Sequence, residues 1–317
     1  MKIAFFEVCK EDEAVFEGMF GGAELVFVEE KLNKSNVAKA ENAEIVSVFT
    51  CSTLNKAVID ALPSLKFIVT RSTGFDHIDL EYAKEKGIKV SNVPAYGSRT
   101  VAEFTFALLL TLSRKVREAT CALKENGSYS VPENVEGFDL SEKTLGVVGT
   151  GKIGKNVIGI ARGFNMNVLA CDLHPDLEFA KQNNFAYKTF DEVISQSDII
   201  TLHAPSTKEN FHLINQENIS KMKKGVYLIN TARGDLVDTK ALLSALEEGI
   251  IAGAGLDVLE GEGKFKKGDT IPMLDMPNVV MTPHIAFDTV EAEWRIMQTT
   301  VENIKGFISG APVNLVN

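Results

Sequence analysis

The segment Leu145-Gly146-Val147-Val148-Gly149-Thr150-Gly151-Lys152-Ile153-Gly154 decides the fold of this chain. A short apolar run, typical of a buried strand, leads into three glycines with the spacing G-x-G-x-x-G. The first glycine allows a tight turn, the second lets the backbone approach a pyrophosphate, and the third lets helix and strand pack closely. The N–H groups at the start of the helix then face phosphate oxygens. The segment therefore predicts a dinucleotide-binding unit, with Gly149, Gly151, Lys152, Ile153 and Gly154 at the cofactor.

A second apolar run, Met166–Cys171, ends at Asp172. Asp172 lies 18 residues after Gly154, near the spacing of about 20 expected for an acid that binds the cofactor ribose. A carboxylate accepts hydrogen bonds from ribose hydroxyls and repels a 2′-phosphate. We therefore expect NAD rather than NADP as the cofactor.

The composition indicates a globular protein of two domains. A length of 317 residues exceeds the size at which single cores stop growing, and 45% apolar with 24% charged residues is ordinary for such proteins. The net charge of −10 and the absence of a long basic run argue against nucleic acid as a partner. No run approaches the ~18 apolar residues of a membrane span. Four scattered cysteines without C-x-x-C spacing predict free thiols in a reducing compartment, and hence a cytoplasmic protein.

Short apolar strands alternate with amphipathic helical stretches along the whole chain. This rhythm predicts an α/β fold of two doubly wound parallel sheets covered by helices on both faces. Only the second series carries the glycine motif. The expected strands of the first series are Lys2–Glu7, Glu24–Val28, Glu44–Phe49, Leu65–Thr70 and Ile88–Ser91. Those of the second are Leu145–Gly149, Asn167–Cys171, Ile199–His203, Val226–Asn230, Ile251–Leu256 and Val279–Thr282.

A connecting helix is expected between the two series. Thr100 and Glu103 have the spacing of a capping box, in which each side chain bonds the backbone N–H of the other. An apolar stripe follows, so one long helix is predicted from this cap to about Lys124, stopped by Asn126-Gly127.

Polar residues that follow strand ends are the candidates for chemistry, because ligands of open α/β sheets bind beyond the carboxyl ends of the strands. In the second series these are Arg233, Asp257, Glu262 and His284, and in the first the run Arg71–Gly74. If the two domains flank one cleft, all of them can face it.

These residue types suit hydride transfer between a nicotinamide and a 2-hydroxy or 2-oxo acid. Reduction of a ketone needs a proton donor, and a histidine such as His284 supplies one near neutral pH. A carboxylate on the second ring nitrogen, for which Glu262 is the candidate, fixes the tautomer. Arg233 can hold the substrate carboxylate and carbonyl oxygen through its forked donors.

Each of the three also has a plainer interpretation. Arg233 fits an ordinary surface loop, Glu262 a solvated turn between two glycines, and His284 the end of a strand. His203 competes with His284 for the role of the acid, because it too follows a strand.

The remaining histidines carry no predicted chemistry. His77 fits a turn before the expected helix Leu80–Lys86, and we expect His174 and His212 to be exposed. No H-E-x-x-H or paired-histidine spacing occurs, so no metal site is expected.

Taken together, these segments resemble the D-isomer-specific 2-hydroxyacid dehydrogenase family over nearly the whole chain. The resemblance rests on the glycine motif and on the runs Asn230–Gly234, Gly255–Val258 and Thr282–His284. It implies that Arg233, Glu262 and His284 are the catalytic residues and that His203 lies on the cofactor side. It also implies further cofactor positions, which are Ala204, Pro205, Asn210, Thr231, Ala232, Arg233 and Asp257.

The resemblance further implies the domain architecture. Residues 1–98 with 285–317 would form a discontinuous, flavodoxin-like substrate-binding domain, and residues 99–284 a Rossmann NAD-binding domain. The family is usually dimeric, so a homodimer through the NAD-binding domain is expected.

Within the family the chain is most similar to the D-lactate dehydrogenases, which implies reduction of pyruvate to D-lactate. The diagnostic stretches are Thr70–Asp79, Asn92–Tyr96 and His284–Phe287. Phe49 stands where typical D-lactate enzymes have a tyrosine. The implied substrate-binding residues are Phe49, Thr73, Gly74, Tyr96, Arg233 and Phe287.

Two alternatives remain open. The first is reduction of another small 2-oxo acid, such as hydroxypyruvate, glyoxylate or a longer-chain acid. The second is a non-enzymatic, NAD-sensing binding protein of the same fold.

Overall fold

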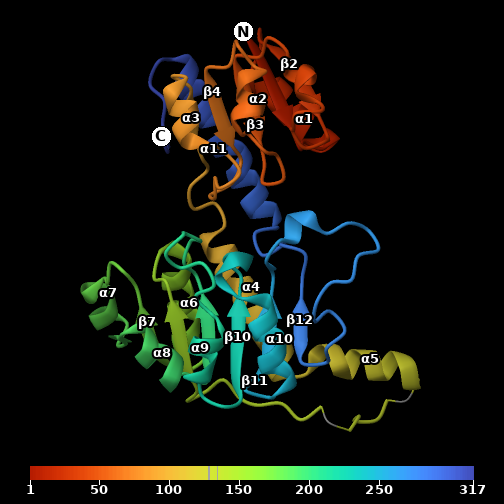
Figure 1. Cartoon of the computed structure of the whole chain (residues 1–317), viewed down its shortest axis with the longest axis vertical. Helices are drawn as coiled ribbons and strands as arrows, with labels where there is room; N and C mark the ends of the chain where they lie inside the picture. The colour runs from red at the N-terminus through yellow and green to blue at the C-terminus, as the bar shows by residue number, and fades with distance from the viewer. Residues whose placement is uncertain (128, 134) are drawn as a thin grey trace. The chain divides into compact units, whose positions relative to one another are not determined.

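The computed structural model describes residues 1–127, 129–133 and 135–317. The chain divides into two compact units (Figure 1). Unit 1 combines Met1–Tyr96 with Thr289–Asn317, and unit 2 is Gly97–Asp288. Each unit is built around one sheet in which every strand pair is parallel, as the alternation of strands and helices predicted.

The five-stranded sheet of unit 1 has the order β2-β1-β3-β4-β5, which is that of flavodoxin-like folds. Successive residues of a strand face opposite sides. Accordingly Ile3 and Phe5 pack on one face, while Ala4 and Phe6 pack on the other. The strands are β1 Lys2–Phe6, β2 Glu24–Val28, β3 Ile45–Val48, β4 Phe67–Thr70 and β5 Lys89–Ser91.

The helices of unit 1 cover both faces of its sheet. They are α1 Lys10–Met19, α2 Lys56–Asp60, α3 Leu80–Glu85 and α11 Val290–Ile308, with a 3₁₀ turn at Val37–Ala40. The C-terminal α11 packs against β4, where Phe307 stacks on Phe67 with ring centroids 4.5 Å apart.

The seven-stranded sheet of unit 2 has the order β12-β11-β10-β9-β6-β7-β8. The strands are β6 Thr144–Val148, β7 Asn167–Cys171, β8 Ala186–Tyr187, β9 Ile199–Leu202, β10 Val226–Asn230, β11 Ile251–Leu256 and β12 Val279–Met281. The sequence did not indicate β8, because two residues are too few to show a strand pattern. All other expected strands are present with small differences at their ends.

The helices of unit 2 also lie on both faces of its sheet (Figure 1). They are α4 Ser98–Ser113, α5 Val116–Asn126, α6 Lys152–Gly163, α7 Leu177–Gln182, α8 Phe190–Gln196, α9 Gln216–Ser220 and α10 Thr239–Glu247. Short 3₁₀ turns occur at Gly234–Leu236 and Glu262–Lys264. Among the described residues, no helix combines the length and the apolar character that a membrane crossing requires.

The prediction of one long helix from a cap at Thr100 is wrong. Gly97 is the N-cap of α4 and makes no side-chain cap bond, so Thr100 lies inside the helix and Glu103 instead pairs with Arg99 at 3.2 Å. The helix ends at Ser113, and α5 starts after Lys115, which adopts a left-handed φ of 53°. The expected stop at Asn126-Gly127 is confirmed, with Gly127 in the left-handed region.

The break between α4 and α5 has a cause far along the chain. The carbonyl of Ser113 accepts the N–H of Phe138 at 2.8 Å, in place of the next helical turn. A Cβ on Gly137 would lie 2.3 Å from that same carbonyl oxygen, so the returning segment touches the end of α4. No local pattern could have indicated this contact.

Candidate functional site

The three glycines of the turn after β6 have different surroundings, which suit three different roles. Gly149 has a φ of +91°, and a Cβ there would lie 2.7 Å from the carbonyl carbon of His203. A Cβ on Gly154 would lie 2.1 Å from the oxygen of Gly149, so this residue lets α6 pack on the turn. A Cβ on Gly151 would meet nothing within 4 Å. The turn is therefore closed on two sides and open at the start of α6, which fits a dinucleotide pyrophosphate.

Asp172 follows β7 and lies beside this turn. Its Oδ2 accepts the N–H of Thr150 at 2.5 Å and the Thr150 hydroxyl at 2.9 Å, and its Oδ1 accepts the N–H of His174 at 2.8 Å. Burial raises the pKa of Asp172, but these hydrogen bonds and the nearby His174 together hold it below its usual value. The carboxylate is thus ionised, as an acid that selects ribose hydroxyls over a 2′-phosphate must be.

Asp257 holds the turn that carries His284. This aspartate is 1% exposed, and its carboxylate accepts the Thr282 hydroxyl at 2.6 Å and the N–H groups of Ile285 and Ala286 at 2.8 and 2.9 Å. Its backbone carbonyl accepts the N–H of His284 at 2.8 Å. His284 adopts a φ of +57°, a strained conformation for a residue with a side chain. The bonds to Asp257 keep the backbone there.

His284 and Glu262 form a direct pair. Nδ1 of His284 lies 2.5 Å from Oε1 of Glu262. Since a carboxylate only accepts, Nδ1 carries the proton, and Nε2 is the ring nitrogen left for chemistry. Burial raises the pKa of Glu262. The hydrogen bond and charge of His284, the N–H of Leu259 and the charge of Arg233 act the other way and hold the pKa below its usual value.

Arg233 follows β10 on a turn that Asn230 closes. Asn230 donates from its side chain to the Arg233 carbonyl at 2.8 Å and accepts the N–H of Ala232 at 3.0 Å. Nη1 of Arg233 donates to the Ala232 carbonyl at 2.7 Å. The hydroxyl of Thr231 lies 3.0 Å from that of Thr105 on α4, which ties this turn to the connecting helix.

His203 is unsuited to be the proton donor. Burial lowers its pKa to about 3, and its buried Nδ1 has no hydrogen-bond partner among the described residues. Nε2 lies 2.9 Å from the Thr201 hydroxyl. A ring that stays neutral at physiological pH cannot supply a proton there, which argues against His203 as the proton donor.

The loop after His203 is held by hydrogen bonds between its own residues. Asn210 donates to the Pro205 carbonyl at 2.7 Å and accepts the N–H of Thr207 at 2.7 Å. The backbone of Ala204 lies close to Gly149. A Cβ added to Gly149 would lie 2.8 Å from the backbone nitrogen of Ala204.

The sequence predicted that the side chains of His174 and His212 are exposed. His174 is exposed, as predicted. His212 is not: its side chain is 27% exposed, because its ring is held between carboxylates.

Within unit 1, the predicted substrate-binding residues follow β3 and β4. Thr73 donates from its hydroxyl to the Val93 carbonyl at 3.0 Å, and its own carbonyl accepts from Asn92 at 2.8 Å. Among the described residues, no backbone or side-chain acceptor receives the N–H groups of Thr73 and Gly74. These two amides fit the binding of an anionic group.

A buried network that was not predicted fixes the loop carrying Phe49. The guanidinium of Arg71 donates to the carbonyls of Phe6 and Glu7 at 2.7 and 2.6 Å and to the Ser47 hydroxyl at 2.9 Å. The Glu7 carboxylate accepts the N–H groups of Phe49, Cys51 and Ser52. Glu7 directly follows β1, so the rule of strand ends that selected the other candidates could have found it.

The two other predicted substrate residues are placed as follows. The Tyr96 carbonyl, in unit 1, accepts from Nε of Arg295 at 2.7 Å. Phe287, in unit 2, lies beside the start of α4, where a Cβ on Gly97 would be 3.7 Å from its Cβ.

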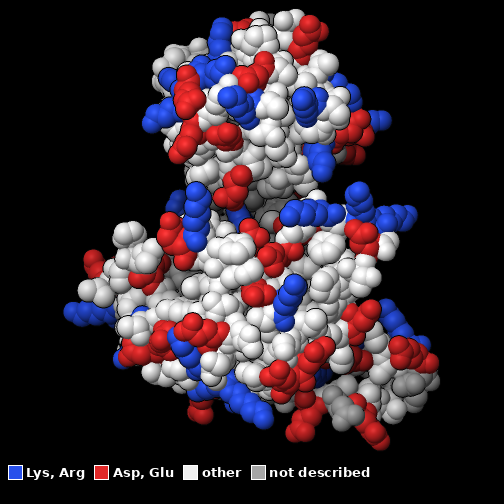
Figure 2. Space-filling view, in the orientation of Figure 1, with Lys and Arg blue, Asp and Glu red and all other residues white. Residues whose placement is uncertain are grey.

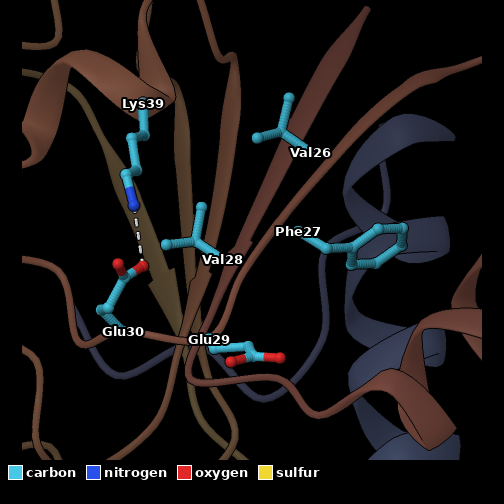
Figure 3. Close-up of a pocket in the computed structure, with 6 residues that line it drawn as sticks. All are labelled: Val26, Phe27, Val28, Glu29, Glu30 and Lys39. Carbon is cyan, nitrogen blue, oxygen red and sulfur yellow. Dashed lines mark hydrogen bonds and ion pairs between the residues drawn. The ribbon is translucent and has the colours of Figure 1, made fainter.

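A hollow at the edge strand β2 is lined by none of the predicted site residues. Figure 3 shows this hollow, lined by Val26, Phe27, Val28, Glu29, Glu30 and Lys39, in which Lys39 and Glu30 pair at 2.8 Å. Figure 2 shows Lys and Arg mixed with Asp and Glu over the visible face of each unit. The described residues contain no cluster of three or more His, Cys, Asp or Glu placed to hold a metal ion.

Comparisons with known proteins match this geometry to one family. Residues 106–286 match the NAD binding domain of the D-isomer specific 2-hydroxyacid dehydrogenases. A 2-hydroxyacid dehydrogenase homologue of Zymomonas mobilis is 39% identical, over 98% of both chains. An aromatic 2-oxoacid reductase of Clostridium sporogenes is 40% identical, over 87% of this chain and 85% of its own.

A crystal structure gives a likeness of the same extent. It is the D-lactate dehydrogenase of Aquifex aeolicus in complex with NAD and lactic acid, with 39% identity, a TM-score of 0.90 and coverage of 98% of this chain and 96% of its own. Other relatives are named glyoxylate reductase and hydroxypyruvate reductase.

The glycine turn generates a paired prediction. Gly151→Ala adds a methyl group in open space with an unstrained φ of −64°, so the melting temperature should stay within a few degrees while NADH affinity falls at least about tenfold. Gly154→Ala places the same methyl group against the backbone of Gly149, so it should lower the melting temperature clearly. Thermal unfolding and fluorescence titration with NADH measure both. Equal effects of the two variants on stability would contradict this division of roles.

Proposed function

This chain belongs to the D-isomer-specific 2-hydroxyacid dehydrogenase family, and we propose that it reduces pyruvate to D-lactate with NADH. The cofactor of the family is NAD, and the ionised Asp172 beside the glycine turn suits its ribose. The observation that carries the proposal is the pair of His284 and Glu262 at 2.5 Å, with the charge of Arg233 acting on the same carboxylate.

The chemistry divides between cofactor and protein. Bound NADH supplies the hydride that adds to the carbonyl carbon. His284 donates the proton from Nε2 to the carbonyl oxygen, which becomes the hydroxyl of the product. Glu262 keeps the opposite ring nitrogen protonated and stabilises the imidazolium before transfer. Arg233 holds the substrate carboxylate and the carbonyl oxygen through separate N–H groups. Solvent returns the proton to His284 after the product leaves.

The choice of pyruvate rests on the proposed substrate-binding residues. The N–H groups of Thr73 and Gly74 are assigned to the substrate carboxylate, together with Arg233. Phe49, Tyr96 and Phe287 are assigned to contacts with the substrate side chain, because apolar rings suit a methyl group. Relatives of similar identity carry names for several 2-oxo acids. Reduction of glyoxylate, hydroxypyruvate or a longer acid is therefore the second candidate, since one methylene changes discrimination by only ~1–3 kcal/mol.

A panel of 2-oxo acids with NADH and NADPH tests the function. We expect the highest kcat/KM for pyruvate with NADH, and D-lactate as the product by chiral analysis. In the control variant His284→Ala, turnover should fall about 10²–10⁴-fold with NADH affinity kept. A higher kcat/KM for another 2-oxo acid would move the assignment to that acid. NADH binding without turnover of any acid would favour the NAD-sensing alternative, and near-normal turnover in His284→Ala would reject the assigned acid.

A homodimer formed through the NAD-binding unit and a cytoplasmic location complete the proposal. The four cysteines are free, which fits a reducing compartment. Apolar side chains are exposed on α5 and just after it, and a second copy of the chain would bury them if it bound there. They are Val116, Leu123, Tyr129 and Val131, with exposed fractions of 51%, 41%, 98% and 89%.

Light scattering tests the dimer. The chain has a mass of 34.6 kDa, and we expect twice that value in solution. Val131→Asp places a charge in the proposed interface and should shift the population towards monomer. Val290→Asp, at an 81% exposed position of unit 1, is the matched control and should not. A wild-type mass of one chain would contradict the dimer.

A further inference from the structure

Unit 2 contains a second pair of histidine and carboxylate close to the first. Nε2 of His212 donates to Oε1 of Glu260 at 2.8 Å, and Oε2 of Glu260 accepts the Thr239 hydroxyl at 3.2 Å. Nδ1 of His212 lies 3.8 Å from a carboxylate oxygen of Asp238. Glu260 is two residues before Glu262, so this pair holds the same turn that carries the proposed partner of His284.

His212 is itself held firmly. Its backbone adopts a φ of +54°, its N–H donates to the Asp235 carbonyl at 2.9 Å, and its ring stacks on Phe211 with centroids 3.9 Å apart. Two residues later, Ile214 pairs with Val237 in a parallel bridge. The backbone of His212 is thereby fixed to the segment that follows Arg233.

The turn Leu259–Glu262 is compact and lies against the same segment. The N–H of Glu262 donates to the Leu259 carbonyl at 3.0 Å, and the Glu262 carboxylate accepts the N–H of Leu259 at 2.9 Å. A Cβ on Gly234 would lie 2.2 Å from the carbonyl carbon of Leu259 and 2.4 Å from the nitrogen of Glu260. The backbones of Arg233-Gly234 and of the turn thus touch without space between them.

The carboxylates of this turn are held from two sides. Glu262 pairs with His284, and Glu260 pairs with His212 and Thr239. Beyond Glu262, residues 263–270 are exposed and give the turn no buried support. Without the His212 ring, Glu260 would lose its charged or polar donor on one oxygen and would face the carboxylate of Asp238. With no ring between them, these two like charges would repel, and we expect this repulsion to displace the turn.

We propose that His212 is a positioning residue: by holding Glu260, it fixes the turn so that Glu262 meets His284 and Arg233 keeps its place beside them. This inference rests on the proposed function for its kinetic consequence, because a displacement of about 1 Å at the reacting groups can cost on the order of 10²-fold in rate. The geometric part, which concerns the bond of Glu262 to His284, does not depend on the substrate.

The test compares His212→Leu with His212→Gln, whose amide nitrogen can reach the place of Nε2. For His212→Leu we expect a fall of about tenfold in kcat and an NADH affinity within about twofold of wild type. In proton NMR spectra, the low-field resonance of the His284 Nδ1–H should broaden or vanish. His212→Gln should restore most of the rate and the resonance. Lys223→Met, which removes a half-exposed ion pair of 3.0 Å with Asp198 at the amino end of the same sheet, is the matched control and should change neither.

A double variant separates positioning from general damage. If His212 acts through Glu260, then His212→Leu with Glu260→Ala should lower kcat no further than the more impaired single variant. Additive losses, or an unchanged rate and resonance in His212→Leu, would overturn the proposal. If His212→Leu fails to fold, Glu260→Ala takes its place, and the same loss of rate and of the resonance is expected. His212→Gln remains the variant that should keep most of both, and an unchanged rate and resonance in Glu260→Ala would overturn the proposal. If wild type binds NADH and reduces no 2-oxo acid, the proposed function fails, and the resonance alone then decides whether His212 positions the pair.

Discussion

One buried carboxylate organises the end of the sheet where the chemistry is placed. Asp257 accepts three hydrogen bonds from the turn after β12, and each of these bonds to a charged acceptor is stronger than one between neutral groups. A buried charge is tolerated only when it is bonded in this way. The same bonds hold His284 in its left-handed conformation. If this turn relaxed, the imidazole of His284 would move away from the Glu262 carboxylate, and the proposed site would lose its proton donor.

The parallel sheet explains how residues far apart in the sequence come to lie at one edge of unit 2. All strands of unit 2 run the same way, so the turns after β6, β7, β10, β11 and β12 meet at one edge. The glycine turn and Asp172 occupy one part of this edge, and the two histidine–carboxylate pairs another. In the proposed function, binding of the dinucleotide and supply of the proton therefore both fall to this one edge of the sheet.

The sheet strands and the candidate residues could be predicted from the sequence, because ligands of parallel sheets bind beyond the carboxyl ends of the strands. Arg233, Glu262 and His284 each follow a strand, so the rule of carboxyl ends selected them, and the resemblance to a family gave them roles. The rule of carboxyl ends alone could not distinguish His203 from His284, because both follow a strand. The buried environment that lowers the pKa of His203 is a property of the fold. The break after Ser113 depends on Phe138, and the support of Glu260 by His212 joins residues 48 apart. Contacts of that range leave no local pattern.

The pH profile of kcat/KM for Glu262→Gln tests the central claim most directly. Glutamine keeps the size of the side chain and can still accept from Nδ1 of His284, but it removes the charge that favours the imidazolium. In the direction of 2-oxo acid reduction, the loss of activity at high pH should therefore begin at a lower pH than in wild type, with NADH affinity unchanged. A profile that coincides with that of wild type would show that the carboxylate at 262 does not act on the proton donor.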